Sequence, residues 1–238
     1  MTDRRLEIAD RLTHVRARIA DAARACGRNP GEITLVVITK TFPASDVRLL
    51  AELGVRDVGE NRHPEAAEKA QACRDLGLRW HYVGQLQTNK ARAVAGYADV
   101  VHSVDRTKVA TALARGRGDP SDVFERPLDC LVQVSLDLPE SGAHRGGVAP
   151  ESALDLAQAV DAHDTLALRG VMAVAPLGAD PRPAFARLAD VAERVRSVAP
   201  QATWISAGMS GDLEAAIEFG ATHVRVGSAI LGTRPAAR

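Results

Sequence analysis

Lys40 is the residue whose type and position most directly suggest chemistry. It follows the most apolar run of the chain, Ile33–Thr39, whose β-branched residues predict a strand buried on both faces. At the C-terminal end of a barrel strand, a lysine that loses water has a lowered pKa and can form a Schiff base. Only four lysines accompany 26 arginines in the chain. The alternative is a lysine that extends its ammonium group out of the strand end into water.

Two segments containing glycine and serine, Ser206–Asp212 and His223–Ala229, form a second candidate site. Each lies at the end of an expected strand, and the loops after the last two strands of a barrel often hold a phosphate through backbone N–H groups. The hydroxyl groups of Ser206, Ser210 and Ser228 add possible donors. Either loop alone is explained by ordinary turn chemistry, but two such loops on neighbouring strands favour a phosphate site.

Arg225 lies within the expected strand at 222–227. If it points into the barrel it needs a polar partner, and if it points outward it pairs on the surface; the sequence leaves both possibilities open. An inward arginine, a Schiff-base lysine and a phosphate site together fit pyridoxal 5′-phosphate (PLP), which has a ring nitrogen, an aldehyde and a phosphate.

Composition excludes several classes of protein. Thirty acidic and thirty basic residues give zero formal net charge, and only 3% of the residues are aromatic, so nucleic-acid binding is not expected. The first residues lack the apolar core of a signal peptide, and no apolar stretch approaches the ~20 residues of a membrane span. Cys26, Cys73 and Cys130 are far apart, which predicts neither a disulfide framework nor a metal site. We expect a cytoplasmic protein.

Short apolar runs alternate with helical patterns along the chain. After one helix within residues 1–30, the runs predict strands near 33–39, 55–58, 79–84, 99–103, 128–135, 166–173, 203–206 and 222–227. Helix-compatible stretches follow the strands, so we predict a single α/β domain over residues 1–238, with a leading helix (1–30) and a (β/α)8 TIM barrel (31–235). A doubly wound open sheet is the alternative, but no G-x-G-x-x-G follows the first strand.

Several motifs carry a resemblance to a known family. They are Val37–Thr41, Gly59–Arg62, His81–Lys90, His102–Asp105, Gly208–Asp212 and Arg225–Arg234. Through them the chain resembles, over about residues 33 to 234, the pyridoxal-phosphate homeostasis proteins, which are single-domain relatives of the alanine racemase barrel. The resemblance implies that Lys40 carries PLP as a Schiff base and that Arg225 faces the ring nitrogen. The full cofactor-binding set that we expect is Lys40, Asn61, Ser206, Met209, Ser210, Arg225, Gly227 and Ser228.

Some positions depart from the family pattern or stay open. The segments His63–Glu65, Ala143–Gly147 and Met172–Pro176 differ from it. We expect a local change of contacts at His63–Glu65, the role of Ala143–Gly147 is in doubt, and the motif at Met172–Pro176 is looser. His81 and His102 either line the pocket or bond to neighbouring backbone. Gln87, Asn89 and Lys90 either bind an outer ligand or cap a helix, and Asn61 either reaches the cofactor or forms a turn.

Two functions from different classes compete. The resemblance implies a protein that binds, buffers or delivers PLP in vitamin B6 homeostasis, with apo-enzymes that use PLP as partners and no strong turnover; we expect a monomer. The alternative is an amino-acid racemase, which needs a second base. The resembled racemases take that base from a C-terminal domain, whereas this sequence ends eleven residues after Gly227, and neither Tyr82 nor Tyr97 has a matching context. A Schiff-base aldolase is less favoured, because the strand near 166–173 has no lysine.

Overall fold

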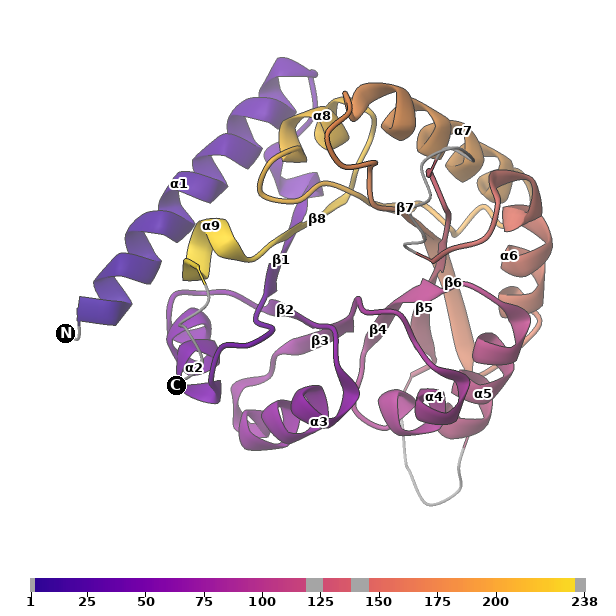
Figure 1. Ribbon diagram of the computed structural model, residues 1–238, viewed down its shortest axis with the longest axis horizontal. Coiled ribbons are helices and arrows are strands. Elements are labelled where there is room, and N and C mark those ends of the chain that lie inside the picture. Colours follow the sequence, from indigo (N-terminus) through magenta and orange to yellow (C-terminus); the bar gives the residue numbers. More distant parts are fainter. Residues whose placement is uncertain (1–2, 119–125, 138–145, 234–238) are drawn as a thin grey trace.

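The strands of the chain close into one parallel barrel. The computed structural model describes residues 3–118, 126–137 and 146–233. The strands follow one another in chain order around the ring, and β1 pairs with β8 to close it (Figure 1). They are β1 (Thr34–Ile38), β2 (Asp57–Glu60), β3 (Arg79–Tyr82), β4 (Val100–Val104), β5 (Leu128–Gln133), β6 (Leu166–Met172), β7 (Trp204–Ser206) and β8 (His223–Val226). The predicted eight-stranded barrel is confirmed.

One strand lies two residues beyond its predicted position. The sequence favoured residues 55–58, but β2 covers Asp57–Glu60 and includes Gly59. Glycine usually weakens a strand, yet here the absence of a side chain lets β2 approach β1 closely. A Cβ atom on Gly59 would lie 2.5 Å from Cδ1 of Ile38 and 3.2 Å from Cγ1 of Val36.

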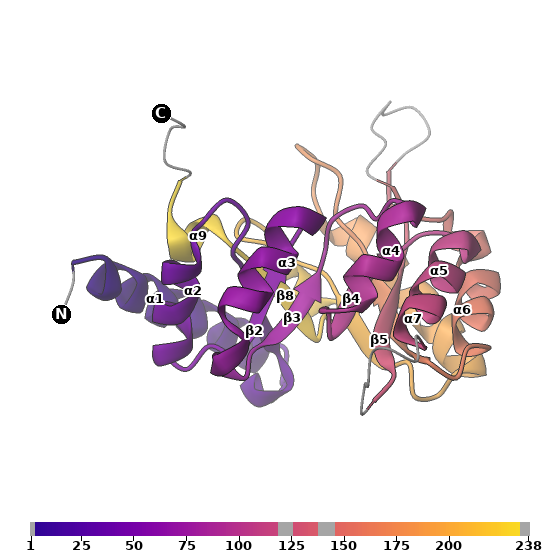
Figure 2. The same cartoon turned by 90° about the horizontal axis from the view of Figure 1, so that it is seen from below.

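Helices surround the strand ring, as the views along and across the barrel show (Figures 1 and 2). They are α2 (Ala44–Glu52), α3 (His63–Ala72), α4 (Thr88–Ala95), α5 (Thr107–Arg117), α6 (Ala153–Asp161), α7 (Arg182–Val198), α8 (Leu213–Glu218) and α9 (Ser228–Leu231). Pro64 stands in the first turn of α3, where its missing N–H costs no helical hydrogen bond.

The predicted leading helix is α1 (Asp3–Ala25), which lies outside the ring beside α8 and α9 (Figure 1). Its buried residues recur at helical spacing and include Ile8, Leu12, Val15 and Ile19. They join the same apolar cluster as residues of α8 and α9. None of the described helices is both long and apolar enough to cross a membrane.

The beginnings of the strands enclose an aromatic and charged cluster. The ring centre of Trp204 lies 4.9 Å from the guanidinium carbon of Arg79 and 5.6 Å from that of Arg169. Both arginines donate to Asp129, which is buried. This charge-paired cluster packs the lumen at one end. The predicted cofactor-binding residues lie at the other end, where the strands stop.

Candidate functional site

The predicted site residues gather at one end of the barrel. In a closed parallel barrel all strands end on the same face, where active sites are found. Lys40 follows β1, Asn61 follows β2, and the loops after β7 and β8 carry Met209, Ser210, Gly227 and Ser228. Ser206 and Arg225 stand within β7 and β8 themselves.

Lys40 stands in a turn rather than inside its strand. β1 ends at Ile38, and Lys40 is exposed. The expectation that this lysine loses its water by burial is therefore wrong, because the apolar run ends before it. Its exposure leaves the primary amine accessible to a ligand from solution.

The turn that carries this lysine is held from both sides by α3. Lys69 donates to the carbonyl oxygen of Thr39 at 2.9 Å, and the backbone N–H of Thr41 donates to Oε1 of Glu65 at 2.8 Å. Thr41 has a φ of +69°, a left-handed conformation that is costly for a β-branched residue. The turn is thus strained and is fixed by contacts on either side of the lysine.

A buried ion pair supports this turn. Nζ of Lys69 lies 2.5 Å from Oε1 of Glu60, which also accepts from the hydroxyl of Thr39 at 2.6 Å. Burial raises the pKa of Glu60, although the bonds from Lys69 and Thr39 act in the opposite direction. These residues were not among the site residues predicted from the sequence. The spacing of Glu65 and Lys69, one helical turn apart, and the scarcity of lysine were the available signals.

The loops after β7 and β8 meet at the site. The hydroxyl oxygens of Ser210 and Ser228 lie 3.4 Å apart. The backbone N–H groups of Ser210, Gly211, Ser228 and Ala229 donate to no acceptor within the part of the chain that the structure describes. We call residues 208–212 and 227–229 the paired loops. Their free donors suit an anion such as a phosphate.

Glycines permit this close arrangement. Gly208 has a φ of +90°, and a Cβ atom there would lie 2.7 Å from Cβ of Ala216. At Gly227 a Cβ atom would lie 3.1 Å from the carbonyl oxygen of Ile38 in β1. Met209 stands between Gly208 and Ser210, and its backbone N–H donates to the side chain of Asp212 at 2.6 Å. Larger residues at either glycine would push the loops away from their neighbours.

Arg225 points into the barrel, which settles the orientation that the sequence left open. It is 5% exposed and donates to Oγ of Ser206 at 2.6 Å and to the carbonyl oxygen of Ala173 at 2.9 Å. Burial lowers the pKa of Arg225 to about 10, so its guanidinium keeps its charge at neutral pH. The hydroxyl of Ser206, which we expected to offer a phosphate donor, is instead shared between Arg225 and His102.

The two histidines bond to side chains rather than to backbone. Nδ1 of His81 lies 2.8 Å from Nε2 of His102, and Nε2 of His81 lies 2.9 Å from Asp57. Burial lowers the pKa of His81 and of His102, so both rings are neutral at pH 7. Asp57 was absent from the sequence-based set, because nothing local marks it as a partner of a distant histidine.

The other open positions contribute less. The backbone carbonyl oxygen of Asn61 accepts a hydrogen bond from the hydroxyl of Tyr82 at 3.3 Å. Gln87 and Lys90 are exposed at the start of α4, and Gln87 makes no side-chain capping bond. Of the segment Ala143–Gly147, residues 143–145 lie outside the described ranges.

Comparison with known proteins identifies the family. Residues 11–235 match the model of the alanine racemase N-terminal domain. A pyridoxal phosphate homeostasis protein of Mycobacterium tuberculosis is 42% identical over 254 residues, covering 98% of this chain and 95% of that protein. The chain belongs to the pyridoxal phosphate homeostasis protein family. A member from Escherichia coli is 37% identical and covers 96% of this chain.

Solved structures agree with this family. The structure of PipY from Synechococcus elongatus with PLP bound has a TM-score of 0.80 and 32% identity, covering 94% of this chain and all of that one. An alanine racemase from Corynebacterium glutamicum has a TM-score of 0.65 at 16% identity, and the match covers 62% of that enzyme. At this identity the racemase shows the shared barrel fold alone.

Proposed function

We propose that this protein binds PLP through Lys40 and acts in PLP homeostasis, holding the cofactor, buffering it or delivering it. The observation that carries the proposal is the convergence, at one end of the barrel, of unpaired N–H groups from the paired loops with an accessible lysine and an inward cation. The relatives named above are called pyridoxal phosphate homeostasis proteins, and the PipY structure contains PLP.

The chemistry of the donors fits each part of the cofactor. When bound, PLP supplies an aldehyde that reacts with a primary amine. Lys40 offers that amine, and the paired loops offer N–H groups for the phosphate dianion. Arg225 can only donate, so it favours an unprotonated ring nitrogen as its acceptor. Asn61 and Met209 complete the proposed set beside the ring and the phosphate.

This donor set holds the cofactor without promoting strong turnover. A cation at the ring nitrogen opposes its protonation and makes the ring a weaker electron sink than an aspartate partner would. A racemase also needs a second base on the opposite face of the substrate. Burial raises the pKa of Tyr82 and of Tyr97, which makes each tyrosine a poor base near neutral pH because it stays protonated.

The cellular setting belongs to the same proposal. We infer a single cofactor-binding domain over residues 1–238, working in the cytoplasm as a monomer, with apo-enzymes that require PLP as the recipients. Size-exclusion chromatography with light scattering tests the monomer. Transfer of PLP from the loaded protein to an apo-enzyme, followed by the recovered activity of that enzyme, tests delivery.

Borohydride reduction and peptide mapping test the lysine. We expect the label on Lys40 alone, and Lys40→Ala should abolish the visible absorbance of the bound cofactor while Lys90→Ala, an exposed control, retains it. A label on another lysine with Lys40 unmodified would overturn the assignment. Exchange of the amino-acid α-proton in deuterated water tests turnover. Rates of about 1–10³ per second that vanish in Lys40→Ala would make the protein an enzyme.

A further inference from the structure

A continuous chain of hydrogen-bonded side chains crosses the barrel interior. Oδ1 of Asp57 lies 2.9 Å from Nε2 of His81, whose Nδ1 lies 2.8 Å from Nε2 of His102. Nδ1 of His102 lies 2.8 Å from Oγ of Ser206, which accepts from Arg225 at 2.6 Å. We call these five residues the histidine relay.

The histidine relay joins the two ends of the barrel. Asp57 is the first residue of β2, whereas Ser206 is the last residue of β7. His102 lies in β4, which does not neighbour β7 in the sheet, so the bond from His102 to Ser206 spans the lumen. His81, His102 and Ser206 are at most 1% exposed, so the middle of the relay is shielded from bulk solvent.

Both ends of the relay impose the same hydrogen-bond direction. The carboxylate of Asp57 only accepts, so Nε2 of His81 carries a hydrogen and its Nδ1 accepts from His102. Nδ1 of His102 then accepts from the hydroxyl of Ser206. At the other end Arg225 only donates, so Ser206 accepts from it and turns its hydrogen toward His102. Every donor therefore points from Arg225 toward Asp57, and bonds aligned in this way polarise one another.

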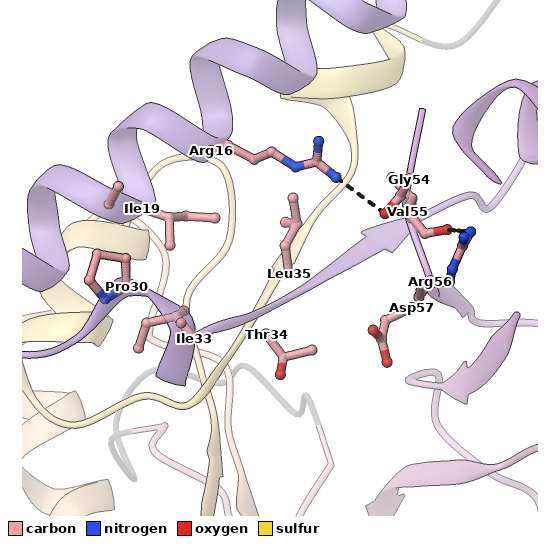
Figure 3. A pocket seen from close by; sticks show the side chains of 12 residues that line it. Arg16, Ile19, Pro30, Ile33, Thr34, Leu35, Gly54, Val55, Arg56 and Asp57 are labelled. Carbon is pink, nitrogen blue, oxygen red and sulfur yellow. Dashed lines mark hydrogen bonds between the residues drawn. The ribbon is translucent and has the colours of Figure 1, made fainter. Parts of the chain in front are cut away.

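The Asp57 end of the relay is accessible from the far face of the barrel. Its side chain is 21% exposed, and it lines a pocket of about 500 Å³ between α1 and the beginnings of β1 and β2. Figure 3 shows Asp57 below Arg56 at this pocket, with Arg16 reaching across from α1. Water in this pocket can therefore reach one end of a chain whose other end is Arg225.

We propose that Asp57 is a positioning residue for the cofactor site. Through the histidine relay it fixes the orientation of the Ser206 hydroxyl, which accepts from Arg225 and so holds the guanidinium in place. The proposal rests on the proposed function, because it assigns Arg225 to the ring nitrogen. Among the described residues no carboxylate lies within 4 Å of Arg225. Asp212 acts on its charge through space, and the relay is the hydrogen-bonded path from this buried cation to a carboxylate.

Histidine NMR tests the relay without any cofactor. In nitrogen-15 spectra of the free protein at neutral pH, we expect both His81 and His102 as neutral rings protonated at Nε2. Asp57→Asn should shift the ring nitrogens of His102, which does not touch residue 57. The control is Asp99→Asn, because Asp99 has a similar side-chain exposure of 26% but bonds to the backbone N–H of Trp80 and to Arg126. A ring protonated at Nδ1, or His102 signals that respond equally to both variants, would refute the relay.

Cofactor binding tests the coupling. We expect Asp57→Asn to weaken PLP binding about two- to tenfold and to change the absorption spectrum of the bound cofactor, whereas Asp99→Asn changes neither. In a Ser206→Ala background, which interrupts the relay, Asp57→Asn should have no further effect. Equal affinities and spectra for Asp57→Asn and Asp99→Asn would disprove the coupling while leaving the proposed function intact. Failure of the unmodified protein to bind PLP would instead disprove the proposed function.

Discussion

Mild acid should destabilise this protein through its buried histidines. Burial lowers the pKa of His81, His102 and His223, and it lowers that of His223 to about 3. In the unfolded chain a histidine titrates near 6.5, so below that pH the unfolded state binds protons that the folded state refuses. The stability that these neutral histidines contribute is therefore present above about pH 6.5 and is lost as the pH falls from there toward 3. A histidine stabilised in its charged form would behave in the opposite way.

The size of the effect follows from the pKa difference. One pH unit below the unfolded value, a histidine that stays neutral in the folded state costs about 1.4 kcal/mol of unfolding free energy. His223, whose pKa burial lowers to about 3, then gives a loss of about 1.4 kcal/mol between pH 7.5 and 5.5, and the lowered pKa values of His81 and His102 add to this loss in the same direction. For a chain of this size the loss from His223 alone lowers the thermal midpoint by roughly 3–6 °C.

Thermal unfolding at both pH values and constant ionic strength checks this prediction. Glu60, whose pKa burial raises, acts in the opposite direction, so a variant is needed to isolate the histidines. His223→Gln removes one of them and should reduce the pH-dependent loss by about 1.4 kcal/mol. Equal midpoints at pH 7.5 and 5.5, or a loss unchanged in His223→Gln, would refute the assignment of neutral buried histidines.

Two further predictions concern the paired loops and the turn after β1. Ser228→Ala should weaken PLP binding by about 0.5–1.5 kcal/mol, the net value of one neutral hydrogen bond, whereas Gly227→Val should abolish binding by crowding Ile38; titration calorimetry that ranked the alanine variant worse would contradict binding by backbone N–H groups. Lys69→Met should destabilise the fold by about 3–5 kcal/mol by leaving Glu60 buried without its cation. Adding Glu60→Gln should recover part of that loss in chemical denaturation, and no recovery would count against the ion pair.

Local pattern was enough to predict the barrel. β4 and β5 are buried at every position, and strands buried on both faces are rich in apolar residues, here interrupted by His102 and Ser103 in β4 and by Asp129 and Gln133 in β5. The strand β2 was predicted two residues too early because Gly59, which has no side chain, is typical of a turn when only its neighbours in the sequence are considered. Only its contacts with Ile38 and Val36, which belong to another strand, show why glycine is required there.

Part of the candidate site could also be predicted from the local sequence, and part depends on contacts between distant strands. Lys40 and the serines of the paired loops follow strands directly, so their shared face could be predicted from the order of the elements. The bond between His102 and Ser206, the serine that holds Arg225, could not be predicted, because the two residues are 104 positions apart and meet only across the lumen. The exposure of Lys40 is the alternative that the sequence left open, because it depends on where β1 stops.

The histidine relay explains how a buried arginine can remain available to a ligand. A carboxylate in direct contact would occupy the N–H groups of Arg225, which the ring nitrogen needs as donors. Removing every negative group from the lumen would leave a buried charge without compensation, which is costly. With His81, His102 and Ser206 between them, Asp57 and Arg225 remain coupled through aligned hydrogen bonds that use one N–H of the guanidinium. The neutral state of both histidines makes this possible, because an added proton on either ring would place another positive charge in the buried lumen near Arg225.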